Sequence, residues 1–236
     1  MGSEDKYRSF IYGDGEKNTQ WRFGSPPNYD VVNKLFEEGR THEWAKGSLE
    51  EKVQRLVKTF EMEIFHKSNP EDFKIINSTK FRFSLNGGKE LTIQEIGKLG
   101  GGYNAFLQTK LPKELRIYDP QQETFSTSYA LFTTVFPRGF ALEILEVLSG
   151  PPRIVYKFRH WGFMEGPFKG HAPTGEKVEV YGMSIFHVDE GMRVEKVEFF
   201  YDPSQLLSGF LKGQLTESSV STTSTSCPFL SAGGTH

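Results

Sequence analysis

The sequence predicts a mixed α+β fold in which helices cover one face of an antiparallel sheet. Residues 157–207 have the residue types and turn signals of strands joined by two successive hairpins. Residues 48–66 begin with a helix-capping pattern and continue with apolar residues at helical spacing. Because such strands need helices to cover their apolar side, we expect both parts to belong to one domain.

Three parts are expected along the chain. Residues 1–29 contain scattered Gly and Pro, which favours an extended arm, and their many aromatic residues predict that the arm packs on the body. Residues 30–213 form the α+β domain. Residues 214–236 are rich in Ser and Thr and cannot bury enough apolar area to offset the entropy of ordering. We therefore predict a disordered tail, with Cys227 in its apolar Cys-Pro-Phe-Leu patch.

The first half of the domain reads as helical. Residues 29–38 predict a short helix that ends at Gly39. Ser48 and Glu51 have the spacing of a capping box, in which each side chain bonds the backbone N–H of the other. The following helix carries its apolar residues on one face, at Leu49, Val53, Leu56, Val57, Phe60 and Ile64.

Shorter elements are expected between this helix and the hairpins. Residues 81–85 predict a strand that leads into a turn at Asn86–Gly87. Residues 91–98 read as a helix that the three glycines at 100–102 interrupt. Residues 123–135 predict another helix, and residues 140–148 another strand.

The hairpins themselves occupy the rest of the domain. A strand that begins at Lys157 is bent by several glycines and turns back at Pro173–Gly175. Residues 177–188 and 193–201 are the next two strands, and the turn at 189–191 joins them. Asp202 follows the last strand and precedes Pro203, which begins an apolar helical turn.

Composition limits the partners and the compartment. With 28 basic and 30 acidic residues the net charge is −2, so we expect no attraction to nucleic acid. No window offers the roughly 18 apolar residues of a membrane span. The N-terminal residues lack a secretory pattern, and Cys227 is the single cysteine, so a cytoplasmic protein without an internal disulfide is expected.

Aromatic content points to a small-molecule partner. Phe, Trp and Tyr make up 14% of the residues, with 21 Phe, and such side chains line ligand cavities as readily as they fill cores. No metal site is expected, because the histidines are dispersed and no ligand spacing occurs. No phosphate loop, dinucleotide fingerprint or nucleophile elbow is present, so no cofactor is expected.

Two alternatives for the chemistry remain open from the residues alone. Asp202 serves as a general acid/base with a pKa raised by its apolar surroundings, or it caps the helical turn at Pro203, which the residue types favour. Arg159, His160 and Trp161 are consecutive on a strand, so either His160 faces the cavity or the other two do.

Several segments resemble known families. One set of segments resembles the SnoaL-like polyketide cyclases of the nuclear-transport-factor-2-like superfamily. These segments are Gly166, Gly170, Pro173–Gly175, Gly182, Asp189–Gly191, Tyr201–Pro203 and Leu206–Leu207. Almost the whole chain, over roughly residues 5–213, is similar to the plant pathogen-related proteins. The matching segments are 5–8, 16–18, 33–40, 102–104, 136–140, 149–152 and 158–162.

The resemblance implies a cone of curved antiparallel sheet wrapped around the N-terminal helices, with a cavity inside. It implies a defence-associated protein that binds a small hydrophobic metabolite and isomerises or cyclises it by cofactor-free proton transfer. The alternative is a non-catalytic ligand-binding or interaction protein. It also implies a homodimer formed through the open face of the sheet, where Tyr181, Met183 and Ile185 would lie.

The predicted site residues have two kinds of role. Asp202 and His160 are the catalytic candidates, and the matching position in the SnoaL-like cyclases implies the acid/base role of Asp202. The substrate-binding candidates are Arg159, Trp161, His66, Glu63, Ser184, Tyr103 and Phe186.

Overall fold

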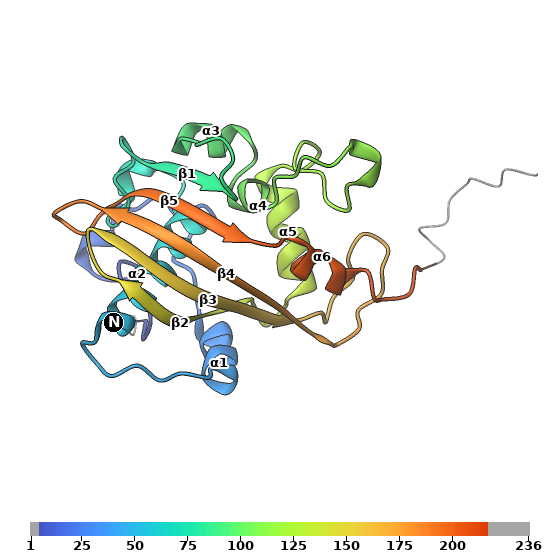
Figure 1. The fold of residues 1–236 in the computed structure, drawn as a ribbon, viewed down its shortest axis with the longest axis horizontal. Helices are drawn as coiled ribbons and strands as arrows, with labels where there is room; N and C mark the ends of the chain where they lie inside the picture. The colour runs from blue at the N-terminus through green and yellow to red at the C-terminus, as the bar shows by residue number, and fades with distance from the viewer. Residues whose placement is uncertain (1–4, 217–236) are drawn as a thin grey trace, which may run out of the picture.

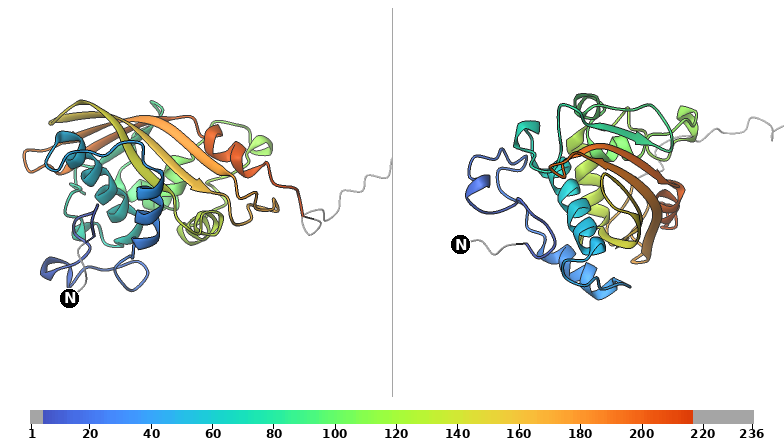
Figure 2. Two further views of the ribbon diagram at one scale, coloured as in Figure 1. Left: turned by 90° about the horizontal axis from the view of Figure 1, so that it is seen from below. Right: turned by 60° about the vertical axis from the view of Figure 1, so that its left-hand side comes forward.

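In the computed structural model, which describes residues 5–216, five strands form one curved sheet that does not close into a barrel (Figure 1). The strand order is β1-β5-β4-β3-β2. Helices lie against the inner side of this sheet, and the other side is largely open (Figure 2). The predicted α+β fold is confirmed.

Four strands run antiparallel in chain order: β2 (Ala141–Ser149), β3 (Arg153–Phe163), β4 (Lys177–Val188) and β5 (Val194–Tyr201). The short strand β1 (Arg82–Leu85) pairs with β5 in parallel. The expectation of a wholly antiparallel sheet is therefore wrong at this edge. No hairpin joins β1 to β5, so no tight turn dictates their relative direction.

Six α-helices and three 3₁₀ turns accompany the sheet in the described part of the chain. The helices are α1 (Asp30–Gly39), α2 (Leu49–His66), α3 (Ile93–Lys98), α4 (Gly102–Phe106), α5 (Phe125–Val135) and α6 (Ser204–Phe210). The 3₁₀ turns are Asp14–Glu16, Pro70–Asp72 and Lys113–Leu115.

Helix α2 is the central helix and begins where its capping residue predicts. Ser48 Oγ accepts a hydrogen bond from the Glu51 N–H at 3.2 Å. The reciprocal bond of the expected capping box does not form, because the Glu51 carboxylate accepts from the Gly47 N–H at 3.4 Å instead. The apolar residues Val53, Val57 and Phe60 are buried against the inner face of the sheet. The amphipathic pattern of the helix therefore decides which of its sides packs on the sheet.

Glycines produce the predicted breaks between the short elements. Gly100 and Gly101 have φ values of +95° and +96°, a region that disfavours other residues, and they separate α3 from α4. Asn86 and Gly87 have φ values of +49° and +69°, as a tight turn that follows the sheet twist requires. Leu91 then returns to pair with Phe83 of β1.

The N-terminal arm lies along the body and is anchored at the end of α2. Trp21 pairs with Lys67, and the Arg22 N–H donates to the His66 carbonyl at 2.8 Å. Lys67 is fully buried and forms ion pairs of 3.0 Å with both Glu16 of the arm and Glu63 of α2. Two buried carboxylates thus share one buried ammonium where the arm meets the helix.

At the other end of the chain, residues 214–216 hydrogen-bond to residues 170–172, so ordered backbone extends past the expected boundary at 213. The rest of the predicted tail, with Cys227, lies outside the described residues.

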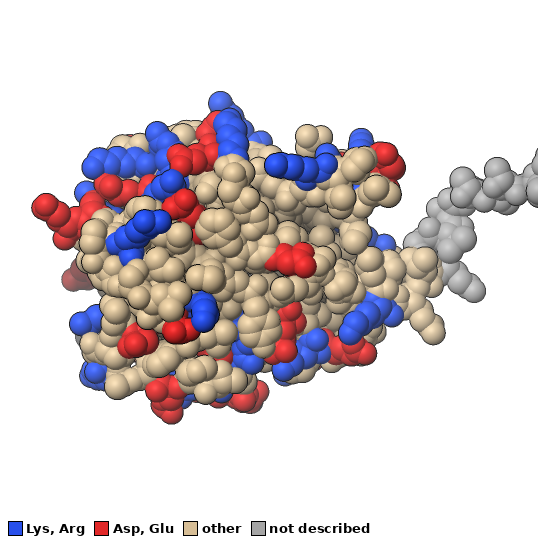
Figure 3. All heavy atoms as spheres, viewed as in Figure 1, with Lys and Arg blue, Asp and Glu red and all other residues tan. Residues whose placement is uncertain are grey.

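The open face of the sheet exposes apolar side chains. Tyr181 and Met183 of β4 and Phe200 of β5 are 48%, 38% and 39% exposed. Figure 3, which views the molecule from this side, shows few Lys, Arg, Asp or Glu side chains over the middle of the sheet. Within residues 5–216, no helix combines the length and the apolar character needed to cross a membrane.

Candidate functional site

A pocket of about 240 Å³ lies between the inner face of the sheet and the helices. Strands β3, β4 and β5 supply one wall, helices α2, α4 and α5 supply the opposite wall, and the N-terminal arm contributes Arg8 and Tyr29. More than half of the lining residues are Phe or Tyr. Such a lining favours a flat, largely apolar molecule that can stack on aromatic rings.

His160 and Glu61 are the polar pair inside this aromatic lining. His160 Nε2 lies 3.2 Å from Glu61 Oε1. A carboxylate can only accept a hydrogen bond, so its place beside Nε2 favours the tautomer with the proton on Nε2 and the lone pair on Nδ1. His160 Nδ1 is buried and has no hydrogen-bond partner among residues 5–216. The aromatic pocket is therefore lined by a histidine whose second ring nitrogen is buried and unpartnered among these residues.

The position of this imidazole follows from strand alternation and ring packing. His160 lies on the face of β3 that carries Tyr156 and Phe158, and this face points toward α2. Its ring stacks on Phe140, with centroids 5.2 Å apart and planes within 11°. A stacked ring held by a carboxylate has little freedom to rotate, so Nδ1 keeps one direction.

Arg159 and Trp161 lie on the opposite face of β3, outside the pocket. Arg159 Nη2 lies 2.8 Å from Glu143 Oε2 and donates to the Gly39 carbonyl. The Trp161 ring packs on Phe36 of α1. The open alternative is thus decided in favour of His160, and the structure does not bring the other two residues to the predicted site.

Asp202 also lies outside the pocket. Its side chain is exposed and accepts hydrogen bonds from the Ser204 N–H at 2.9 Å and from Ser204 Oγ at 2.6 Å. These bonds, the side-chain bond first, lower the pKa of Asp202 below its usual value. The expected raised pKa is therefore wrong, and the geometry is that of a carboxylate capping the first turn of α6. Its neighbour Tyr201 lines the pocket in its place.

Two of the predicted binding residues do line the pocket. His66 ends α2, and burial first and the nearby Arg8 and Arg22 second lower its pKa to about 4. It is thus a neutral imidazole at ordinary pH. Tyr103 stacks on Phe132, with ring centroids 4.3 Å apart, and burial raises its pKa so that it stays a neutral phenol.

The other three predicted binding residues lie elsewhere in the interior. Glu63 points away from the pocket and accepts from the backbone N–H groups of Lys74 and Ile75 as well as from Lys67. Ser184 is fully buried and donates to the Glu198 carbonyl at 3.1 Å. Phe186 packs on Phe60 in the main core. These side chains hold the fold together around the pocket.

Of the two carboxylates in the last turn of α2, sequence reasoning chose Glu63 as the site residue, whereas the structure places Glu61 in the pocket. Glu61 and Phe65 are four residues apart and share one face of α2, whereas Glu63 is two residues from Glu61 and so faces nearly the opposite way. Arg8 and Tyr29 had no local signal, because the path of the arm over the body decides their place.

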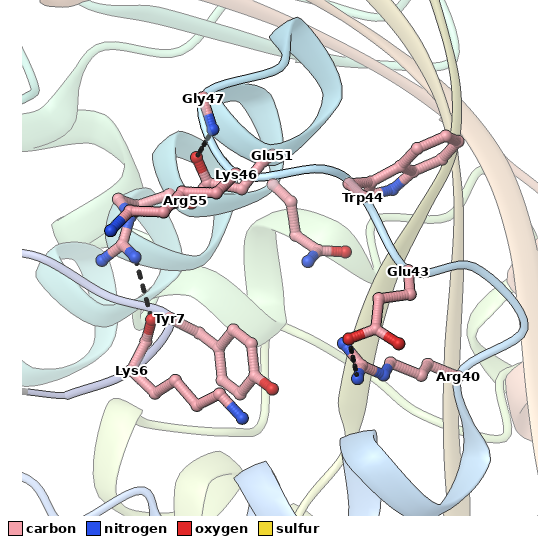
Figure 4. Close-up of a pocket in the computed structure, with 10 residues that line it drawn as sticks. Lys6, Tyr7, Arg40, Glu43, Trp44, Lys46, Gly47, Glu51 and Arg55 are labelled. Atoms are coloured by element: carbon pink, nitrogen blue, oxygen red, sulfur yellow. Dashed lines mark hydrogen bonds and ion pairs between the residues drawn. The ribbon is translucent and has the colours of Figure 1, made fainter.

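A second hollow, of about 420 Å³, lies beside the arm and the segment before α2. Figure 4 shows the basic side chains Lys6, Arg40, Lys46 and Arg55 around it, together with Glu43 and Glu51. Most of these cations already have partners, since Lys6 pairs with Glu37, Arg40 with Glu43, and Arg55 with Glu51. Three of its four cations are thus paired with carboxylates, so the aromatic pocket is the stronger candidate site. Residues 5–216 contain no group of three or more His, Cys, Asp or Glu side chains placed to hold a metal ion.

Comparisons with known proteins give one strong match in sequence. A pathogen-related protein from barley (Hordeum vulgare) is 57% identical over 231 residues, which cover 97% of this chain and 96% of that protein. No protein-family model matches the chain.

Comparison of the backbones gives more distant similarities. A putative SnoaL-like polyketide cyclase from Jannaschia sp. CCS1 has 16% identity and a TM-score of 0.40, with 73% of this chain and 100% of that chain covered. A putative polyketide cyclase from Acidithiobacillus ferrooxidans has 13% identity and a TM-score of 0.39, with coverages of 72% and 100%. An LEH-like epoxide hydrolase from M. tuberculosis has 13% identity and a TM-score of 0.34, with coverages of 67% and 88%.

Proposed function

The chain belongs to the pathogen-related protein family, and on that premise we propose that it binds a small, largely aromatic molecule in the sheet–helix pocket and moves a proton on it. The reaction is an isomerisation or a ring closure without a cofactor. His160 is the base, and Glu61 is the residue that positions it. The protein acts in the cytoplasm as part of defence.

The observation that supports this proposal most strongly is the unpartnered Nδ1 of His160. A buried polar atom without a hydrogen bond costs free energy, on the order of 1–3 kcal/mol. Such an atom is explained if a ligand supplies the missing partner. The Glu61 carboxylate lies 3.2 Å from Nε2, so a negative charge already stands beside the ring that takes the proton.

The chemistry that suits this arrangement is proton abstraction next to a carbonyl group. His160 Nδ1 takes the proton, and the electron pair of the C–H bond becomes part of an enolate. In a β,γ-unsaturated ketone this enolate is a dienolate, and the proton returns from Nδ1 to the γ carbon, which gives the conjugated isomer. In a ring closure, the enolate carbon instead attacks a second carbonyl, and the proton goes to the new alkoxide.

Tyr103 and Tyr129 are suited to stabilise the enolate oxygen. Both line the pocket. Burial raises the pKa of each phenol, so both remain protonated and can donate. Donors already aimed at developing negative charge are a large part of enzymatic rate enhancement.

A second candidate function is ligand binding without catalysis. The position of Asp202 favours it, because the carboxylate implied by the resemblance to the cyclases is exposed and occupied with capping α6. In that case the pocket is a receptor for a small molecule, and His160 contributes only a hydrogen bond.

The two functions are separated by proton exchange into a cyclic ketone. We expect the protein to accelerate the replacement of the C1 protons of 2-tetralone by deuterium in D₂O, as followed by NMR. His160→Gln should reduce this acceleration about a hundredfold or more, the usual loss for a general base. Glu61→Gln should reduce it about tenfold or more, because Nε2 loses its charged partner.

The matched control is His187→Gln. His187 also pairs with a glutamate, with Nε2 2.9 Å from Glu198 Oε2, but it does not line the pocket. Its substitution should leave exchange unchanged. Binding of 2-tetralone to the wild-type protein without exchange above the buffer rate would favour the non-catalytic function.

A further inference from the structure

We propose that Arg8 anchors a carboxylate in the aromatic pocket, so that the ligand is a small aromatic or cyclic acid. The inference rests on the proposed function, because it names the class of molecule for the same pocket. It concerns the N-terminal arm, whose part in the site the sequence pattern did not reveal.

Arg8 is a nearly buried guanidinium that is only partly used by its neighbours. The residue is 6% exposed and lines the pocket. Its Nη1 donates to Asn33 Oδ1 at 2.7 Å and lies 3.5 Å from Asp5 Oδ1. Within residues 5–216, Nε and Nη2 have no hydrogen-bond partner, and both keep some accessible surface. One edge of the guanidinium is therefore held and the other is free.

The contacts of Arg8 hold it in one orientation. Asp5 and Asn33 fix the Nη1 side and are themselves joined, since Asn33 Nδ2 donates to Asp5 Oδ2 at 2.9 Å. The guanidinium plane rests on the Tyr29 ring, with Cζ 3.6 Å from the ring centroid. A planar guanidinium fixed on one edge offers two parallel N–H donors on the other, which matches the two oxygens of a carboxylate.

The charges around the pocket also favour an anionic end at Arg8. Burial lowers the pKa of His66 and of the buried Lys58, and the positive charge of Arg8 lowers both further. Lys58 is 1% exposed and has no ion pair among the described residues. Asp5, Glu61 and Glu143 act on the pKa of Lys58 in the opposite direction, and an acid group beside Arg8 would add to these carboxylates in offsetting the positive charge.

The carboxylate that lines the pocket pairs with His160 and not with Arg8. Glu61 is the one carboxylate in the described lining, and it pairs with His160. A ligand acid should thus lie at Arg8, while the apolar part of the ligand extends along the aromatic rings toward His160. A volume of about 240 Å³ restricts the ligand to roughly one or two rings.

The test compares two ligands of the same shape by titration calorimetry at neutral pH. The wild-type protein should bind 2-naphthoate at least tenfold more tightly than the neutral 2-naphthamide. Arg8→Met should bring the ratio of the two dissociation constants close to one, with the affinity for 2-naphthamide changed less than threefold. Arg153→Met, which removes an exposed arginine outside the pocket, should leave the ratio unchanged.

A second variant should strengthen the binding of 2-naphthoate instead of weakening it. It keeps Arg8 in place, so the test does not require a protein that folds without this arginine. Asp5→Asn removes the anion that shares the guanidinium, so 2-naphthoate should bind at least twofold more tightly. A merely structural Arg8 would give weaker or unchanged binding. The same titrations with 2-naphthyl phosphate test the anion, and tighter binding of the phosphate than of the carboxylate would overturn the assignment to acids.

Failure of this inference can be told apart from failure of the proposed function. Equal binding of 2-naphthoate and 2-naphthamide, with 2-tetralone exchange still dependent on His160, would overturn the role of Arg8 and leave the proton-transfer function intact. No binding of either naphthalene compound, together with no exchange into 2-tetralone, would overturn both.

Discussion

At the scale of single residues, the site depends on which side of a strand or helix each side chain occupies. His160 faces the pocket, while Arg159 and Trp161 beside it face α1 and the segment after it. Glu61 faces the pocket, while Glu63 faces the buried Lys67. If the register of β3 shifted by one residue, a neighbour such as Arg159 would face the pocket in place of His160. If the facing position on α2 shifted by two residues, Glu63 would face it in place of Glu61.

His66 should make stability depend on pH. Its pKa in the folded protein is about 4, below the value of about 6.5 expected in the unfolded chain. Between these values the unfolded chain binds more protons, so the free energy of unfolding falls as the pH falls. The expected loss between pH 7 and pH 5 is about 2 kcal/mol.

Urea denaturation at the two pH values measures this loss. His66→Gln should remove most of it, because glutamine does not titrate. The control is Thr133→Val, which alters the same pocket without altering its titration. An unchanged difference between pH 7 and pH 5 in His66→Gln would show that other groups cause the pH dependence.

At the scale of elements, the arm, α2 and the segment after it are joined by one buried cluster of charges. Lys67 Nζ lies 3.0 Å from Glu16 Oε2 and 3.0 Å from Glu63 Oε1 and donates to the Asp72 carbonyl at 3.1 Å. Glu63 also accepts from the backbone after the 3₁₀ turn Pro70–Asp72. The path of the arm, and with it the place of Arg8 and Tyr29, is tied to this cluster.

Lys67→Met should therefore be strongly destabilising. It leaves two buried carboxylates without their cation, and removing one partner of a buried ion pair typically costs about 3–5 kcal/mol. Chemical denaturation at neutral pH measures the change. Lys89→Met, which removes an exposed lysine paired with Glu95, should cost less than about 1 kcal/mol. A similar small loss for both variants would mean that the cluster contributes little to stability.

At the scale of the whole molecule, the pocket is assembled from almost the full length of the chain. Its lining runs from Arg8 in the arm to Leu206 in α6 and includes the helix α5 between them. The sheet has one face covered by these elements and one face open to the outside (Figure 2).

We propose that the open face pairs with a second copy of the chain. Met183 lies opposite Phe200 in the register of β4 and β5, and Tyr181 is two residues away on the same face. Contiguous exposed apolar side chains on a sheet are typical of an interface. Light scattering should give about twice the monomer mass of 26.9 kDa.

Met183→Glu should shift this assembly to the monomer, because a charge in an apolar interface loses its water without gaining a partner. The control is Leu115→Glu, since Leu115 is 61% exposed but lies in a 3₁₀ turn away from the sheet. A monomeric wild-type protein at high concentration would contradict the dimer.

The sequence alone determined the features that depend on near neighbours. Side-chain capping by Ser48 sets the start of α2. The φ preferences of glycine set the break at Gly100–Gly101 and the turn at Asn86–Gly87. Residue periodicity and the turns between the strands set the antiparallel order of β2 to β5. The residue types around Asp202 favoured a capping role for the same reason, since its partner Ser204 is two residues away, but they left the acid/base role open.

Tertiary structure alone decided the site. Glu61 and His160 are far apart in the chain and meet through the packing of α2 on β3, and the arm reaches the pocket through contacts at the far end of α2. β1 joins β5 in parallel for the same reason, since no local turn connects them. Local propensity fixes which residues share a face of one element, but the face that meets another element is chosen by the burial of apolar area over the whole chain.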